Sequence, residues 1–69
     1  MNRKLPICLS YAGALGHEYV VTLERDGTER VRLETDSLES ARREYAETVN
    51  PTELPRIYRR TPRGWRLTA

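Results

Sequence analysis

The sequence predicts a small α+β fold: a small antiparallel sheet made of two hairpins, in β-β-β-α-β-β order, with one helix packed on one face. Several short segments alternate apolar and polar residues, as strands do, and one segment spaces its apolar residues by three and four, as a helix does. Turn-forming residues separate these segments. A length of 69 residues is that of a single small domain, so we expect residues 1–69 to share one core.

The composition excludes several classes of protein. At 69 residues the chain is too short for a multi-domain enzyme. It contains one Cys and one His, so it lacks the cysteines of a disulfide scaffold or a structural zinc site. The unpaired Cys8 fits a reducing compartment, so we expect a cytoplasmic protein. No apolar run has membrane-spanning length, and the short one after Lys4 contains Pro6 and Ser10. We therefore expect neither a membrane span nor a secretion signal.

Residues 5–11 are predicted as the first strand. Leu5, Ile7 and Leu9 alternate with less apolar residues, which is typical of a half-buried strand. Pro6 has no backbone N–H and favours an edge position. The small residues that follow predict a loop.

The second and third strands are predicted over 18–24 and 29–35. In the second strand Tyr19, Val21 and Leu23 share one face, because successive side chains of a strand alternate between the two faces. We expect this face to contact the helix.

The Asp-Gly pair between these two strands allows two registers. A two-residue turn would place Leu23 opposite Arg30, a core residue against a solvent-facing one. A loop of three residues that ends at Gly27 pairs Val21 with Val31 instead, and Gly27 then takes the left-handed position of a G1 bulge. Burial favours the three-residue loop, which we therefore predict.

The helix is predicted over 37–49. Asp36 is placed to cap its first turn, with Glu39 completing a capping box. The Asn-Pro pair that follows ends the helix. The apolar residues of this segment form one stripe: Leu38, Ala41, Tyr45 and Val49.

The last two strands are predicted over 56–60 and 65–68, joined by a Thr-Pro-Arg-Gly turn. We expect Ile57 to pair with Leu67 on the inward face. Trp65 is expected to pack in the core, as a single tryptophan in a small protein usually does.

Few residues in the chain favour catalysis. His17 is the only histidine, and nothing marks a third group that would hold it against Cys8 or Ser10 in a nucleophilic pair. The carboxylates mostly have arginines beside them, which is typical of solvated or helix-capping groups. No glycine-rich phosphate loop precedes the helix. We therefore expect no enzymatic activity, no metal and no cofactor.

Basic residues gather at the C-terminal end of the chain. Residues 56–69 contain five arginines and no acidic residue, although the formal net charge is only +2. Guanidinium groups bind phosphate through two hydrogen bonds, and a tyrosine ring offers a stacking surface. We predict a binding surface on the sheet face away from the helix, formed by Arg30, Arg32, Arg56, Tyr58, Arg60, Arg63 and Arg66.

Several interpretations of this surface remain open. It suits nucleic acid or a nucleoprotein complex, and it also suits an acidic protein surface. Alternatively, the arginine stems only cover a thin, half-exposed sheet face. In a further alternative the protein is a protein–protein adaptor or a self-associating homodimer that uses an apolar edge strand.

The hairpin with Tyr19–Val21 and Asp26-Gly27, followed by Asp36–Leu38, resembles the arm-site DNA-binding domains of phage tyrosine integrases. The full order, ending in a hairpin with Gly64-Trp65, is similar to small phage-encoded β-β-α-β-β proteins, among them anti-CRISPR proteins that inhibit type I surveillance complexes. The resemblance covers roughly residues 18–68. It implies a phage-type inhibitor that occupies a nucleic acid or nucleoprotein machine in a bacterial host cell, and it assigns no individual functional residue.

Overall fold

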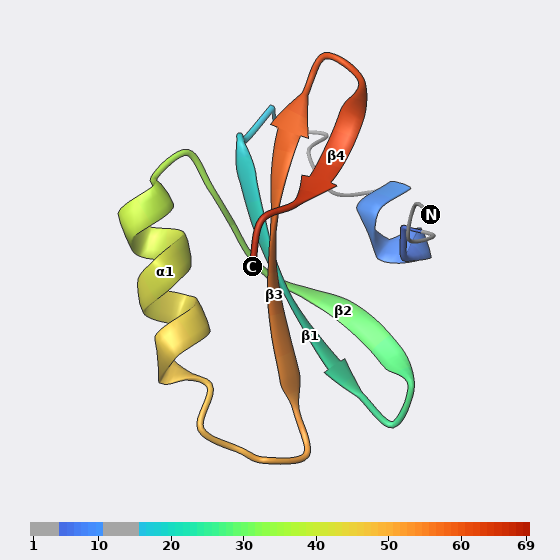
Figure 1. The fold of residues 1–69 in the computed structure, drawn as a ribbon, viewed down its shortest axis with the longest axis vertical. Helices are drawn as coiled ribbons and strands as arrows, with labels where there is room; N and C mark the ends of the chain where they lie inside the picture. The colour runs from blue at the N-terminus through green and yellow to red at the C-terminus, as the bar shows by residue number, and fades with distance from the viewer. Residues whose placement is uncertain (1–4, 11–15) are drawn as a thin grey trace.

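The computed structural model describes residues 5–10 and 16–69. Within these ranges the strands form one antiparallel four-stranded sheet in the order β2-β1-β3-β4 (Figure 1). The predicted α+β class with one helix is confirmed. In chain order the elements are the 3-10 helix η1 (Ile7–Ser10), β1 (Tyr19–Arg25), β2 (Thr28–Thr35), the helix α1 (Leu38–Glu47), β3 (Leu54–Thr61) and β4 (Gly64–Leu67).

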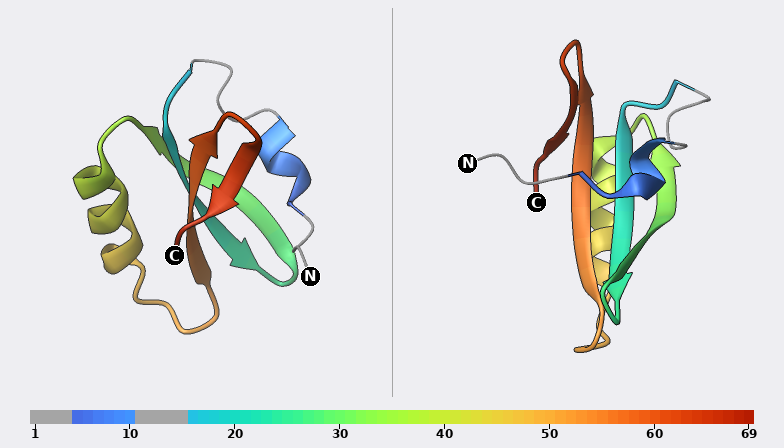
Figure 2. Two further views of the ribbon diagram at one scale, coloured as in Figure 1. Left: turned by 45° about the horizontal axis from the view of Figure 1, so that its top comes forward. Right: turned by 90° about the vertical axis from the view of Figure 1, so that its right-hand side faces the viewer.

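The sheet is covered on both faces. The helix α1 packs against β1, β2 and β3 on one face, and η1 lies on the other (Figures 1 and 2). Burial on both faces explains why two successive residues of β1, Val20 and Val21, are both fully buried. The helix-side core consists of Tyr19, Val21, Ala41 and Ile57, with Leu33 and Leu38 packed on it. The opposite core consists of Leu9, Val20 and Tyr58, with Cys8, Val31 and Trp65 packed on it.

The first predicted strand is wrong. Residues 7–10 form a 3-10 turn in which the Leu9 N–H donates to the Pro6 carbonyl at 3.1 Å. Leu9 is 4% exposed and packs on the sheet face that α1 leaves uncovered. Burial of Leu9, with Cys8 packed beside it, therefore anchors the segment in place of pairing at a sheet edge. Tyr11 and the loop predicted after it lie outside the described residues, except for Gly16.

The first hairpin uses the register that the sequence argument rejected. Its turn is the two-residue pair Asp26-Gly27, with φ angles of 53° and 80°. Positive φ at both positions is what a type I′ hairpin turn requires. Leu23 consequently lies opposite Arg30, and the predicted three-residue loop is wrong.

A β-bulge at Arg32 lets this register bury the apolar residues. Val21 pairs with Leu33 but Thr22 pairs with Val31, so Arg32 is an extra residue in β2. The extra residue shifts the alternation of side chains along the strand. Leu33 therefore packs on the helix-side core while Val31 packs on the opposite core. The prediction failed because it assumed unbroken alternation over the whole strand.

The helix is capped by Ser37 rather than by Asp36. The Ser37 hydroxyl oxygen accepts a hydrogen bond from the Ser40 backbone N–H at 3.1 Å, as an N-cap residue does. The Asp36 carboxylate instead accepts from the Glu18 backbone N–H at 3.0 Å, which ties the start of the helix to the chain before β1. The helix ends at Glu47, earlier than predicted.

The second hairpin is one residue out of the predicted register. Thr61 pairs with Gly64 and Tyr58 pairs with Leu67, whereas the sequence predicts Leu67 opposite Ile57. The turn is tight because Gly64 has a φ of 110°, a conformation that glycine adopts easily. This shift decides which arginines share a face.

Candidate functional site

The structure separates the predicted binding residues into three groups. Arg56 and Tyr58 belong to a buried polar network. Arg30 and Arg32 lie on the outer strand β2. The β3–β4 hairpin carries Arg60, Arg63 and Arg66. The predicted continuous arginine face is therefore absent from the described part of the sheet.

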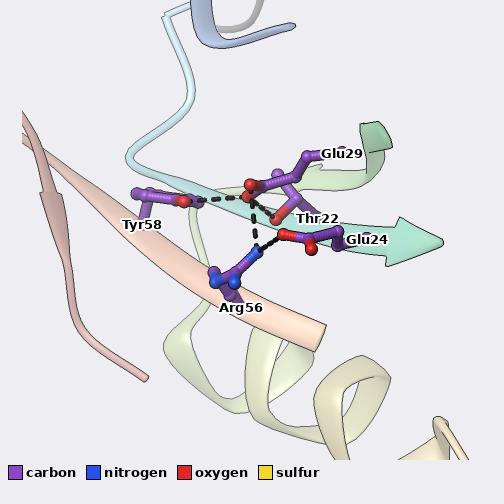
Figure 3. A network of polar contacts seen from close by, with 5 residues as sticks. All are labelled: Thr22, Glu24, Glu29, Arg56 and Tyr58. Carbon is purple, nitrogen blue, oxygen red and sulfur yellow. Dashed lines mark hydrogen bonds and ion pairs between the residues drawn. The ribbon is translucent and has the colours of Figure 1, made fainter. Parts of the chain in front are cut away.

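Glu29 is the centre of the polar network (Figure 3). Its side chain is 5% exposed and accepts hydrogen bonds from the hydroxyls of Thr22, at 2.5 Å, and Tyr58, at 2.8 Å. Nη1 of Arg56 lies 3.0 Å from a Glu29 oxygen and 2.6 Å from a Glu24 oxygen. A buried carboxylate requires such partners, because an isolated charge in an apolar interior is strongly destabilising.

This network gives Arg56 and Tyr58 structural roles. Tyr58 is 0% exposed and packs with Leu9 and Val20, so its ring is not open to the stacking that the sequence suggests. The Arg56 side chain is 16% exposed and contacts two carboxylates. The alternation of β3 places both residues on the predicted face, away from α1, but η1 and the network cover that face.

Arg30 and Arg32 lie on the helix side of the sheet, contrary to prediction. Arg32 Nε donates to the Glu44 carboxylate of α1 at 3.1 Å, and Arg30 pairs with the helix-side residue Leu23. The shifted register and the bulge explain both positions. Because β2 and β4 are opposite edges of the sheet, these arginines do not extend the surface of the C-terminal hairpin.

Four exposed arginines remain on the β3–β4 hairpin. Arg59 lies directly opposite Arg66 in the register of the two strands, and directly opposite like charges destabilise a sheet. Arg66 lies on β4, whereas α1 packs against β1, β2 and β3. The Arg59 side chain is 57% exposed although β3 lies under the helix, so both members of the pair are open to solvent. We call this group the basic hairpin; its members are Arg59, Arg60, Arg63 and Arg66.

The charges of the basic hairpin are poorly compensated. Arg59 Nε lies 3.0 Å from a Glu18 carboxylate oxygen. Arg63, in the turn, and Arg66, in β4, form no ion pair with any residue that the structure describes. An anion that approached this hairpin would therefore meet guanidinium groups that do not first have to leave a carboxylate.

Arg60 occupies the other face of the same hairpin. Its guanidinium carbon lies 4.7 Å from the centroid of the Trp65 ring, an arrangement in which a cation is attracted to the ring face. Arg60 Nε also donates to the His17 carbonyl at 3.2 Å. Trp65 itself packs on the opposite core. Arg60 is thus positioned by the body of the protein.

Sequence reasoning missed Arg59. With Ile57 placed opposite Leu67, Arg59 lies beside Trp65 rather than beside another arginine. The turn could have indicated the correct pairing. A two-residue turn between Thr61 and Gly64 places Arg59 opposite Arg66.

Cys8 and His17, the two residues considered for catalysis in the sequence, lie in different parts of the described structure. Burial raises the pKa of the Cys8 thiol, and the nearby Glu29 charge raises it further, which is the opposite of what a nucleophilic cysteine needs. His17 Nδ1 lies 3.4 Å from a carboxylate oxygen of Asp36, whose side chain is 72% exposed. Across the described ranges, no three His, Cys, Asp or Glu residues are grouped to hold a metal ion.

Comparison of the chain with models of known protein families, with curated proteins and with solved structures gave no match. Among the described residues, no helix has the length and apolar character to cross a membrane.

Proposed function

We propose that this protein is a non-enzymatic binding protein whose basic hairpin docks on the phosphate backbone of nucleic acid, free or in a nucleoprotein complex. It acts by occupying its target. The resemblance in element order to small phage-encoded inhibitors of the anti-CRISPR kind supports an inhibitory role in a bacterial cytoplasm.

One observation carries the proposal: Arg59 and Arg66 lie side by side across the hairpin, with Arg63 in the adjoining turn, and Glu18 is the only acidic partner of these three among the described residues. Like charges at a cross-strand pair cost stability. A dense anion removes that cost on binding, and a nucleic acid backbone supplies closely spaced phosphates.

The structure also separates these arginines from the purely structural ones. Arg56 and Arg32 form ion pairs with carboxylates of the protein. These ion pairs explain the two arginines without a binding partner outside the chain. Arg63 and Arg66 have no such contact with the described residues. This difference, together with the grouping of Arg59, Arg63 and Arg66 on one hairpin, supports a binding role for the hairpin over the interpretation in which all the arginines only cover the sheet.

The test measures binding of a labelled DNA duplex from ~50 to ~300 mM salt, with wild-type protein and two matched double variants. The first variant is Arg63→Gln with Arg66→Gln. The second is Arg30→Gln with Arg42→Gln, which removes two exposed arginines that also form no ion pair among the described residues. Both variants lower the net charge by the same amount.

We expect wild-type binding in the micromolar range or tighter at the lowest salt, because phosphate contacts alone give about 1–100 μM affinity at physiological salt. The Arg63/Arg66 variant reduces the slope of log affinity against log salt by about 2, and the Arg30/Arg42 variant leaves it unchanged. Equal losses in both variants would show that only the net charge matters. Absence of binding at low salt would overturn the proposal.

A further inference from the structure

We infer that the basic hairpin enters the major groove of duplex DNA, with Arg63 at its tip nearest the base edges. This inference rests on the proposed function and adds the form of the nucleic acid and the groove.

The hairpin projects beyond the rest of the sheet (Figures 1 and 2). Arg59 lies opposite Tyr19, the first residue of β1, and the Arg60 backbone N–H donates to the Glu18 carbonyl at 2.8 Å. Beyond these contacts, Thr61 pairs with Gly64 and with no other strand that the structure describes. The projecting part is therefore a short two-stranded ribbon.

The dimensions of such a ribbon fit a major groove. Two paired strands lie ~4.8 Å apart and advance ~3.3 Å per residue, so the two steps from Arg60 to the turn at Pro62 extend the ribbon by roughly 7 Å. The major groove of B-form DNA is about 12 Å wide and about 8.5 Å deep, and it admits a two-stranded ribbon. The minor groove, about 6 Å wide, does not admit it without deformation.

The charges of the hairpin lie on both of its faces. Arg59 and Arg66 belong to the helix-side face, and Arg60 belongs to the opposite face, over Trp65. A flat acidic surface would contact one of these faces only. A groove has a phosphate backbone along each wall, so it would neutralise both faces at once while Arg63 points inward from the turn.

Two other forms of nucleic acid fit less well. Proteins that bind single strands use exposed aromatic rings as stacking platforms, but Tyr58 is 0% exposed and one face of Trp65 is covered by Arg60. The major groove of A-form RNA is too deep and narrow for side chains to read. The combination of ribbon shape and two-faced charge thus selects B-form DNA.

The experiment compares binding and chemical protection on one sequence, prepared as a DNA duplex, an RNA duplex and a DNA single strand. Dimethyl sulfate methylates guanine N7 in the major groove and adenine N3 in the minor groove, so the two protections report the two grooves. Full-length wild type, Arg63→Gln and the control Arg30→Gln are each tested at equal occupancy.

We expect the DNA duplex to be bound at least about tenfold more tightly than the RNA duplex, with guanine N7 protected and adenine N3 unprotected. Arg63→Gln weakens duplex binding about 5- to 50-fold and removes the N7 protection, whereas Arg30→Gln does neither. Salt-dependent binding without N7 protection, or with adenine N3 protection, overturns the groove assignment and leaves the proposed function standing. No binding of any form overturns both.

Discussion

The Tyr58 hydroxyl in β3 donates a hydrogen bond of 2.8 Å to the Glu29 carboxylate in β2, although β1 lies between these two strands. The tyrosine side chain therefore spans the central strand and links an edge strand to the middle of the sheet. Both partners are buried or nearly so, so the bond forms where water cannot replace it. It is a cross-sheet contact on the face that α1 does not cover.

Replacing Tyr58 by Phe tests this contact. The variant keeps the ring but removes a donor to a buried carboxylate, and hydrogen bonds to charged groups are worth about 1.5–3 kcal/mol. We expect a loss of about 2 kcal/mol in the free energy of unfolding by urea. Tyr45→Phe, on the half-exposed surface of α1, is the control and should change the stability by less than about 0.5 kcal/mol. Equal effects in the two variants would contradict a special role for Tyr58.

The two carboxylates that contact Arg56 should differ in energetic weight. Glu29 is 5% exposed and also accepts from Thr22 and Tyr58, whereas Glu24 is 32% exposed. Glu29→Gln leaves Arg56 partly unpaired in a buried site, and we expect it to cost about 3 kcal/mol.

The matched variant Glu24→Gln should cost less than about 1 kcal/mol, because solvent screens the contact that it removes. Urea denaturation of both variants measures the difference. A greater loss of stability in Glu24→Gln than in Glu29→Gln would contradict the assignment of Glu29 as the centre of the network.

Reversing the charge of Arg66 should separate stability from binding. Arg66→Glu turns the repulsive pair with Arg59 into an attractive one, which should raise the free energy of unfolding by about 0.3–1 kcal/mol. The same variant should weaken DNA binding at least about tenfold, because it removes one phosphate contact and adds a repulsive charge. Arg63→Glu, in the turn without a cross-strand partner, should weaken binding without a gain in stability. A destabilised Arg66→Glu variant would show that the repulsion is absent.

The role of Ser37 as the N-cap of α1 can be tested by substitution. Ser37→Ala removes the bond to the Ser40 N–H and should cost about 1 kcal/mol, whereas Ser37→Gly should cost only a few tenths. Thermal unfolding followed by circular dichroism measures both. If Ser37→Ala left the stability unchanged, the hydroxyl would not be acting as an N-cap.

Cys8 should make the folded protein sensitive to alkaline pH. Burial raises the pKa of this thiol above its ordinary value of 9.0, with a further contribution from the Glu29 charge. The folded state holds the thiol proton more tightly than the unfolded state. The resulting stabilisation is therefore complete below pH 9.0 and is lost as the pH rises through the folded-state pKa.

Cys8→Ala lacks this loss, so the stability difference between the variant and the wild type should shift in favour of the variant above pH 9.0. A difference that stays constant with pH would contradict the prediction. The thiol of the folded protein should also react with a disulfide reagent more slowly than that of the unfolded chain at pH 8, because the thiolate is the nucleophile.

The element types could be predicted where the local pattern extends over several residues. Alternation around Val21 and Leu33 and the helical spacing from Leu38 identify the first hairpin and the helix, and the Gly64-Trp65 segment marks the second hairpin. The arrangement of these elements in space depends on longer-range contacts. The rejected turn at Asp26 is favourable only because a bulge further along the chain restores the burial.

The candidate site could be predicted only in part for the same reason. The concentration of arginine after residue 56 is visible in the sequence, and Arg60, Arg63 and Arg66 do lie on an exposed hairpin. Tyr58 and Arg56 share the same local pattern, but their burial depends on Glu29 and on a segment far away in the chain. No local rule shows that one arginine will meet a carboxylate and its neighbour will not.

The bulge at Arg32 also constrains how the chain can change in length. Residues before it, such as Val31, follow one phase of alternation, and residues after it, such as Leu33, follow the other. Deleting Arg32 itself would leave both halves of β2 in their present pairing, because a bulge is one residue added to a regular ladder. Deleting a residue on either side of the bulge would instead move one half of β2 to the wrong side and expose its apolar positions. The turn at Pro62, by contrast, can be lengthened without changing which side of the sheet a strand residue faces. In descendants of this sequence, insertions and deletions should therefore accumulate in the turn at Pro62 and, within β2, be confined to the bulge position.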